Sequence, residues 1–180
     1  ASMYNTAVGY QTGLSVTTAT NNTFIGALVG DAITTGSLNV ALGYQALSAD
    51  TLGSRTTALG YKALQLQNFT TATQTYNVAV GYAAGTAVTF GIANTLVGGL
   101  SGDALTEGNN NVAVGYNTLT ADTKGDRNVA IGSAALATQN FTTSTDSYNV
   151  AVGHGAGNQI TTGIDNTIIG GLAGFALTDA

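Results

Sequence analysis

The chain contains no cysteine, no proline and no tryptophan, and charged residues make up only 7% of its 180 residues. Without cysteine, it has neither a disulfide framework nor a thiolate metal site. Its four cationic side chains and its formal net charge of −5 do not supply the basic stripe that neutralises phosphates. Nucleic-acid binding is therefore not expected.

Long apolar runs are also missing. The stretch from Lys62 to Asp103 has no charge between its two ends, but Asn, Gln, Thr and Gly interrupt its apolar residues every few positions. A membrane-spanning helix needs about 20 predominantly apolar residues, so no span is expected in this segment. A hydrophobic content of 44% can still bury a core, which argues against disorder. No signal peptide is visible, and the chain starts and stops inside repeats, so it reads as a fragment of a longer fibre.

What the chain does have is one short motif in ten copies, typified by Asn77-Val78-Ala79-Val80-Gly81-Tyr82. The copies begin at Asn5, Asn22, Asn39, Thr56, Asn77, Asn94, Asn111, Asn128, Asn149 and Asn166. Each has a glycine four residues on, at Gly9, Gly26, Gly43, Gly60, Gly81, Gly98, Gly115, Gly132, Gly153 and Gly170. The glycines are 17 residues apart, or 21 after every fourth copy, so four copies make a set of 72. This period predicts a single repeat domain over residues 1–180.

Each copy combines a short β-rich run, the glycine, a second short run and a Thr-x-Gly turn, which predicts two strands per coil. Stacked coils of this kind form an all-β parallel β-solenoid, or β-roll, with a rise of about 4.8 Å per coil. We expect the asparagines to occupy left-handed corners and to hydrogen-bond along the stack. We expect the glycines where a side chain would collide with neighbouring backbone or where φ is positive.

Both faces of the predicted strand are apolar, because Val78 and Val80 point one way and Ala79 the other. One face can be the interior, and with no helix to cover the other, a second copy of the chain is the economical partner. A column of alanines would allow close approach: Ala7, Ala41, Ala58, Ala79, Ala113, Ala130 and Ala151. In the second coil of each set Phe24, Leu96 and Ile168 replace this alanine, while Ala27, Gly99 and Gly171 replace the usual tyrosine. We expect this exchange of bulk to keep the interior filled.

The recurring Asn-Val-Ala-Val-Gly and Asn-Val-Ala-Ile-Gly motifs resemble the head repeats of trimeric autotransporter adhesins of the YadA type, and related repeats occur in bacteriophage tail fibres. The resemblance covers essentially the whole chain. It implies a left-handed β-roll of three chains side by side, without enzyme activity, in an extracellular or virion fibre. The 17-residue step, the set of 72 residues and the four-residue insertions depart from the adhesin pattern and favour a viral fibre.

Candidate chemistry is sparse, and we expect no enzyme, no cofactor and no metal site. His154 is the only histidine, and no partner recurs with it. Asp50 and Asp122 are equivalent, as are Asp31 and Asp103, but each pair is four coils or about 19 Å apart, too far for one active site. No calcium-loop pattern occurs. An ion on a symmetry axis stays open.

The two long coils are the best candidates for surface contact. Their insertions include Asn68, Phe69, Thr70 and Thr71 in the first set and Asn140, Phe141, Thr142 and Thr143 in the second. An exposed aromatic ring beside amides and hydroxyls suits carbohydrate binding. The alternative is that each Phe is a packed brace.

A column of threonines raises one further alternative, an ice-binding solenoid. Its members are Thr17, Thr34, Thr51, Thr89, Thr106, Thr123 and Thr161. Ordinary hydroxyl ladders explain such a column equally well. The sequence therefore favours a structural segment of a homotrimeric tail fibre or adhesin, with a receptor- or glycan-binding adhesin head and an ice-binding protein as alternatives. Its partners would be copies of itself and a host-surface carbohydrate or protein.

Overall fold

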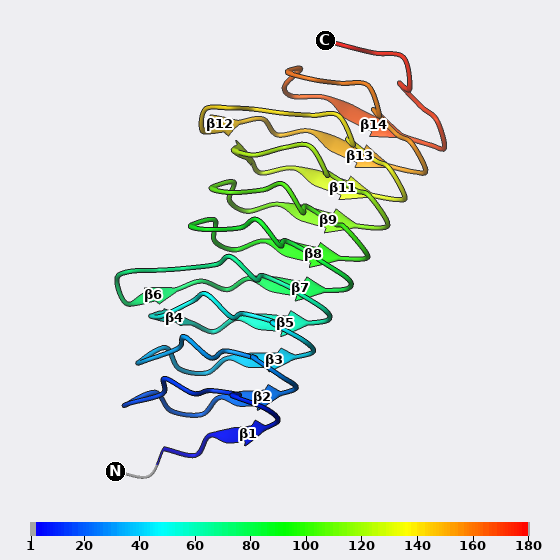
Figure 1. Ribbon diagram of the computed structural model, residues 1–180. Coiled ribbons are helices and arrows are strands. Elements are labelled where there is room, and N and C mark those ends of the chain that lie inside the picture. The colour runs from blue at the N-terminus through cyan, green and yellow to red at the C-terminus, as the bar shows by residue number, and fades with distance from the viewer. Residues whose placement is uncertain (1–2, 180) are drawn as a thin grey trace.

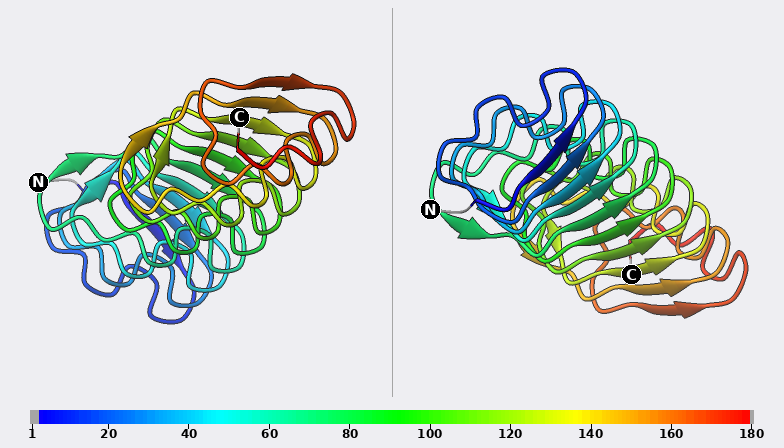
Figure 2. Two further views of the ribbon diagram at one scale, coloured as in Figure 1. Left: turned by 90° about the horizontal axis from the view of Figure 1, so that it is seen from above. Right: turned by 90° about the horizontal axis from the view of Figure 1, so that it is seen from below.

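The chain folds into one continuous stack of coils. The computed structural model describes residues 3–179, and Figure 1 shows the coils rising in sequence order from the N-terminus to the C-terminus. No helix occurs in this range, and one strand of each coil lines up with the next along a single face, as the end views in Figure 2 also show. The predicted all-β solenoid of ten coils is therefore confirmed.

Ten three-residue strands form one parallel sheet in the order β1-β2-β3-β5-β7-β8-β9-β11-β13-β14. Every strand pairs in register with its counterpart one coil away, as Ala79 does with Leu96. The strands are β1 (Thr6–Val8), β2 (Thr23–Ile25), β3 (Val40–Leu42), β5 (Thr57–Leu59), β7 (Val78–Val80), β8 (Thr95–Val97), β9 (Val112–Val114), β11 (Val129–Ile131), β13 (Val150–Val152) and β14 (Thr167–Ile169).

The prediction of two strands in every coil is wrong for most coils. Second strands occur only where a third coil meets a long fourth coil, as β4 (Gly53–Ser54) with β6 (Thr73–Gln74) and β10 (Gly125–Asp126) with β12 (Thr145–Asp146). In several other coils the N–H of this segment bonds to a side chain of the next coil, as Ile92 N does to Oδ1 of Asn109 at 2.9 Å and Ser37 N to the Ser54 hydroxyl at 3.0 Å. Strand pairing needs backbone partners, so no second strand forms there.

The asparagine column is a buried ladder with one interruption, at Thr56, after which the Asn77 N–H bonds to the Thr75 hydroxyl. The Asn94 side chain donates from Nδ2 to the Gly108 carbonyl at 2.8 Å and accepts the Asn111 backbone N–H on Oδ1 at 2.9 Å. Asn94 itself is fully buried, and its own N–H bonds to the Oδ1 of Asn77 at 2.9 Å. Most of the column amides thus close their own coil and join it to the next, while Asn128 and Asn166 donate to the preceding column asparagine instead. The predicted bonding along the column is confirmed.

The expected left-handed conformation belongs to different residues. The residue before each column position, not the asparagine itself, has positive φ, for example Leu38 at 63° and Ala93 at 57°. Two further columns share this conformation, beginning at Gln11 and Gly13. A non-glycine residue in this region is strained in isolation. The stack holds these positions because each turn bonds to its neighbour, as Ala93 N does to Thr75 O at 2.7 Å.

The glycine column combines both predicted constraints. Gly60 has a φ of +140°, and a Cβ placed on it would lie 2.2 Å from the Gly81 carbonyl oxygen. That distance is far inside van der Waals contact, so any side chain would force two coils apart. Glycine at this position is therefore required by the close approach of consecutive coils.

Two inward-facing columns fill the interior, and the size of the side chain in one column compensates for its size in the other. In the second coil of the second set, Leu96 on β8 is buried and faces Gly102, where an added Cβ would lie 2.8 Å from a Leu96 methyl. In the third coils the strand carries alanine and the facing position carries leucine, as Ala41 and Leu47 do. Protein interiors tolerate few voids, so bulk at one column requires its absence at the other.

Two expectations about these columns are corrected. The alanine column faces the interior, where Ala79 and Ala113 are fully buried, and it does not face a neighbouring chain. The tyrosine column does not exchange bulk with the core either, because Tyr44 and Tyr82 lie exposed on the outside. A small residue is needed at the alanine position because leucines from the facing column occupy the narrow interior.

Substituting a ladder asparagine should destabilise the stack strongly. Asn94→Ala leaves the Asn111 N–H and the Gly108 carbonyl buried without partners, so we expect a loss of about 2–5 kcal/mol in the free energy of unfolding. Asn140→Ala is the matched control, because Asn140 is exposed and should change stability by about 0.5 kcal/mol or less. Denaturant unfolding followed by circular dichroism checks both, and equal losses would contradict the ladder's role.

Exchanging bulk between Leu96 and Gly102 should show strong coupling. Leu96→Ala leaves a cavity and should cost about 2–5 kcal/mol, while Gly102→Leu overpacks the core. The double variant reproduces the alanine and leucine arrangement of a third coil, so its destabilisation should be smaller than the sum of the two single changes. A double-mutant cycle in denaturant measures this coupling, and strict additivity would show that the two columns do not compensate.

Candidate functional site: the outer sheet face and the long coils

The outer face of the ten-stranded sheet is apolar along its whole length. The last residue of every strand in this sheet points outward and is aliphatic, and the first is Val or Thr. Several of these side chains are largely open to solvent, with Leu42 48% and Ile169 69% exposed. None of the strand residues is charged. A flat, uncharged row of aliphatic side chains of this extent is characteristic of a contact surface.

A stack of tyrosines borders this face. The rings of Tyr44 and Tyr61 lie 5.6 Å apart, and those of Tyr61 and Tyr82 lie 5.2 Å apart with only 4° between their planes. Lys62 places its Nζ 5.5 Å from the Tyr61 ring centroid. The faces of these rings cover one another, so they present edges and hydroxyl groups outward. His154 continues the same column and is exposed.

The long coils project on the other side, where Figure 1 shows the coils of β6 and β12 extending beyond the coils directly next to them. Of the two alternatives for these phenylalanines, the packed brace is confirmed and the exposed aromatic is not, because Phe69 is 6% and Phe141 7% exposed. Phe69 packs edge-on against Phe90 of the next coil at 6.2 Å, so it is a brace. The burial follows from inter-coil stacking, which gives the insertion an apolar neighbour to cover. Thr70 and Thr71 are exposed beside it.

The other predicted contact residues lie at the same projection. Thr142 and Thr143 are exposed, as is Asn140, whereas Asn68 is half-buried. The Oδ1 of Asn68 accepts the Thr51 hydroxyl at 3.3 Å, and that of Asn140 accepts the Thr123 hydroxyl at 3.2 Å. The insertions therefore present amides and hydroxyls to solvent, without an aromatic face beside them.

A buried carboxylate holds each insertion in place, which the sequence reading missed. Asp50 is fully buried and accepts the N–H of Gly53 at 3.0 Å and of Phe69 at 3.1 Å on Oδ1. Its Oδ2 accepts Nε2 of Gln67 at 2.6 Å, and Gln67 in turn accepts Nδ2 of Asn77 at 2.8 Å. In a standard coil the N–H equivalent to that of Phe69 bonds to a threonine carbonyl of the next coil, as Phe90 does.

The second set repeats the same network. Asp122 accepts the N–H groups of Gly125 and Phe141, both at 3.0 Å, and Nε2 of Gln139 at 2.7 Å. The sequence did carry a signal for it. Eleven residues after each column position the other coils have an aliphatic residue, and only these coils have Asp or Gln: Asp50, Gln67, Asp122 and Gln139.

Burial governs the titration of these carboxyls. Desolvation raises the pKa of Asp50 and of Asp122 above the usual 3.8, although the hydrogen bonds from Gln67 and Gln139 and from backbone N–H groups act in the opposite direction. No cation is among their bonded partners. Each is a lone buried acid, so its charged form has a real energetic cost. Asp50 and Asp122 lie in separate sets, so they do not form the close pair of carboxyls that acid–base catalysis needs.

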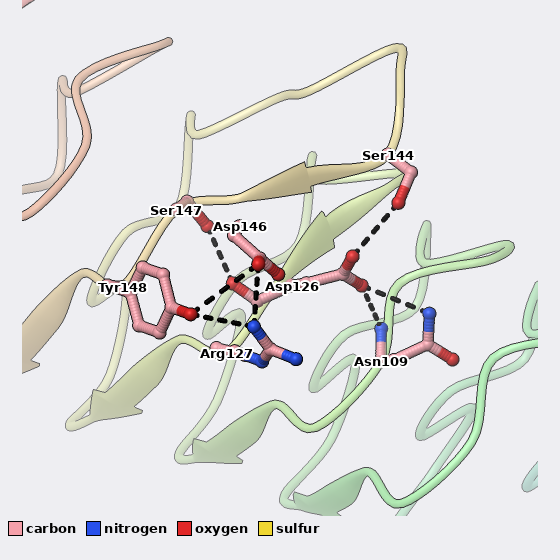
Figure 3. Close-up of polar contacts among 7 residues, drawn as sticks. All are labelled: Asn109, Asp126, Arg127, Ser144, Asp146, Ser147 and Tyr148. Carbon is pink, nitrogen blue, oxygen red and sulfur yellow. Dashed lines mark hydrogen bonds and ion pairs between the residues drawn. The ribbon is translucent and has the colours of Figure 1, made fainter.

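A polar cluster surrounds β10 and β12 in the second set (Figure 3). Arg127 donates to Asp146 at 2.6 Å and to the Tyr148 hydroxyl at 2.7 Å. Asp126 accepts the N–H of Asn109 at 2.6 Å and the hydroxyl of Ser144 at 3.0 Å. The bond to Tyr148 and the charge of Asp146 raise the pKa of Arg127.

The first set has a version of this cluster without the two carboxylates. Ser54 and Gln74 stand where the second set has Asp126 and Asp146, and Arg55 donates to the Tyr76 hydroxyl at 3.3 Å. The carboxylates are therefore not needed to form the projection. The cluster braces the second long coil through exposed bonds, which solvent screens.

Hydroxyl groups of the threonine column donate their hydrogen bonds to carbonyls within the stack. Thr89 donates to the Thr106 carbonyl at 3.0 Å, and Thr106 donates to the Thr123 carbonyl at 3.1 Å. Such hydroxyls can only accept a bond from ordered water, which does not favour ice recognition. Within residues 3–179 no group of three or more His, Cys, Asp or Glu residues converges as a metal site would require. The same range contains no helix able to cross a membrane.

Acidification should stabilise the fold through its two buried carboxyls. In the unfolded chain Asp50 and Asp122 titrate near 3.8, and burial raises their pKa in the folded chain. Their contribution to the free energy of unfolding is therefore full below 3.8 and is lost as pH rises through the raised pKa. Asp31, also raised by desolvation, acts in the same direction, and the exposed Asp179, lowered mainly by its bond from Thr161, opposes them.

The measurement is the denaturant midpoint between about pH 4 and pH 7, in the wild type and in the Asp50→Asn, Asp122→Asn double variant. The wild-type midpoint should fall as pH rises, and the variant should lose most of that slope. A wild-type midpoint that rises with pH, or an unchanged slope in the variant, would contradict the assignment.

Comparison of the chain with protein-family models, with curated proteins and with solved structures gave no match. The resemblance of the Asn-Val-Ala-Val-Gly motifs to adhesin and tail-fibre repeats therefore stays a prediction.

Proposed function

We propose that this chain is a structural segment of a fibre, in which copies of the chain pack side by side through the outer face of the ten-stranded sheet. The observation that carries the proposal is the uninterrupted apolar row on that face. It runs through all ten coils, from Val8 to Ile169, and both of these end residues are more than half exposed in the single chain.

A second copy is the partner that fits this row best. The outward side chains repeat at the coil rise of about 4.8 Å, and a partner that contacts every rung needs the same rise. Another coil stack of the same sequence meets that condition along its full length, because the strands on either side of each long coil, such as β5 and β7, keep the common register. The row has no charged side chain, so copies meet there without electrostatic repulsion.

Three chains around one axis is our preferred number, and it follows from the resemblance to trimeric adhesin heads and phage fibres. Such a fibre belongs outside the cell or on a virion, where a rod must resist unfolding and proteolysis. Its function is mechanical, since the parallel sheet ties every coil to the next and the asparagine ladder adds a further bond at most of these steps.

The long coils give this rod repeated contact points. They recur every 72 residues, or about 19 Å along the stack, so a polymeric surface would meet several of them at once. Surface contact through Asn68, Thr70 and Thr71 and their second-set equivalents stays a prediction. It would rest on hydroxyl and amide groups, because Phe69 is covered.

Charge on the outer face should break the assembly while leaving the single chain folded. Val97 and Val114 are adjacent outward residues of β8 and β9, so Val97→Glu with Val114→Glu introduces neighbouring carboxylates at the centre of the row. We expect the wild type to sediment as a trimer. We expect this variant to dissociate at a concentration at least tenfold higher than the wild type does. Analytical ultracentrifugation over a dilution series measures both.

Thr71→Glu with Thr143→Glu is the matched control, because it adds the same charge at exposed positions of the long coils. Its mass should equal that of the wild type, and circular dichroism should be the same for all three proteins. A wild type that remains a folded monomer at every concentration would refute the proposal, as would a charged outer face that leaves the mass unchanged.

A further inference from the structure

The two insertions share a sequence feature that the fibre role does not use. Each places Asn, Phe and Thr in succession, as Asn68-Phe69-Thr70 and Asn140-Phe141-Thr142. Asn-x-Thr, with any residue but proline between, is the acceptor pattern for asparagine-linked glycosylation. We propose that Asn68 and Asn140 are acceptor sites for a sugar, one on the projection of each long coil.

The side chains of these segments alternate in the way an acceptor needs. Phe69 is buried against the stack, while Thr70 is exposed and Asn68 is partly exposed on either side of it. Phe141 is buried in the same way, between an exposed Asn140 and an exposed Thr142. The buried ring anchors the segment, and the two residues that an enzyme must reach face solvent.

Hydrogen bonds orient each acceptor amide with its nitrogen outward. The Thr51 hydroxyl shares its proton between the Phe69 carbonyl at 2.9 Å and Oδ1 of Asn68 at 3.3 Å, and the Thr123 hydroxyl shares its proton between the Phe141 carbonyl at 2.8 Å and Oδ1 of Asn140 at 3.2 Å. Neither Nδ2 donates a bond within residues 3–179, whereas each ladder asparagine from Asn77 to Asn111 uses its nitrogen on a carbonyl. The buried, unpaired side-chain atoms of this range are Oδ1 of Asp31 and Asn117, so the Asn68 nitrogen is open to water.

The backbone after each acceptor is not held by the neighbouring coil. Asn68 and Asn140 still donate their N–H groups to the next coil, at 3.1 Å and 2.9 Å. In the described part of the chain the N–H groups of Thr70 and Thr142 donate to no other backbone group. Both threonine side chains are exposed, so their hydroxyls can bond inside an active site.

A third match to the pattern serves as an internal control. Asn21-Asn22-Thr23 has the required residues, but Asn22 is buried in the ladder and Thr23 is the first residue of β2, paired on both sides. The Nδ2 of Asn21 donates to the Thr20 hydroxyl at 3.2 Å. This segment cannot leave the stack without breaking the sheet, so the folded chain should offer only the two long-coil sites.

The reaction joins Nδ2 of the asparagine to the anomeric carbon of an activated sugar. With a nucleoside diphosphate sugar as donor, the bond from that carbon to the diphosphate oxygen breaks. The diphosphate leaves with the electron pair, and the amide nitrogen gives up one proton to a base of the transferase. The projection lies away from the outer sheet face, so the sugar would leave that face open (Figure 1).

The test exposes the purified folded protein to an asparagine-linked glucosyltransferase and UDP-glucose and measures intact mass, with peptide mapping. We expect two added hexoses, on Asn68 and Asn140, and none on Asn21. Synthetic peptides carrying each of the three patterns serve as the enzyme control, and all three should accept glucose. Thr70→Ala with Thr142→Ala should abolish transfer, while Thr71→Ala with Thr143→Ala should retain both hexoses.

A folded protein that accepts no glucose at either site, while the peptides do, would overturn the proposal. So would equal modification of Asn21, or transfer that persists in the Thr70→Ala, Thr142→Ala variant. Modification of one long coil only would contradict the equivalence of the two sites. None of these outcomes depends on whether the chain forms trimers, because the same samples can be sedimented separately.

Discussion

The fixed rise between coils is the constraint on which this structure depends. Parallel strands lie about 4.8 Å apart, so every residue must tolerate its own counterpart directly above and below. Gly60 meets that condition by having no side chain where the Gly81 carbonyl approaches. Asn94 meets it by donating within its own coil and accepting from the next. Columns of one residue type follow from this geometry, since a solution that fits one coil fits them all.

The fold could be predicted from the sequence because the same geometry requires a fixed repeat length along the chain. The asparagine and glycine columns fixed the coil length, the strand position and the parallel register. The face of the sheet on which each strand residue lies was harder to predict, because Ala79 and Val80 are both apolar and alternation alone does not say which is inside. The packing partner decides it. Leu47 and Leu64 fill the interior opposite alanines, and that pairing is visible only once both columns are placed in space.

The sequence located the long coils, but it left open whether their phenylalanine is exposed or packed. A sequence insertion predicts a projection, and the projection is present. Whether Phe69 points outward depends on the neighbouring coil, where Phe90 offers it an edge-on contact. The structural role of the buried Asp50 was overlooked although it breaks an otherwise aliphatic column, because Asp50 was weighed only as one of a pair of catalytic carboxylates. Its role depends on the Phe69 N–H, which the insertion leaves without its usual carbonyl.

The molecule thus has two distinct surfaces: an apolar sheet face without charge, and a polar edge of projecting coils. The most direct test of the account places one spin label on the sheet face, using Val114→Cys in a chain that has no other cysteine. Packed sheets lie about 10 Å apart face to face, so pulsed dipolar spectroscopy should find short distances between labels on different chains. Labels at Thr143→Cys should be further apart. Absence of dipolar coupling at position 114, at concentrations where the protein is assembled, would contradict the account.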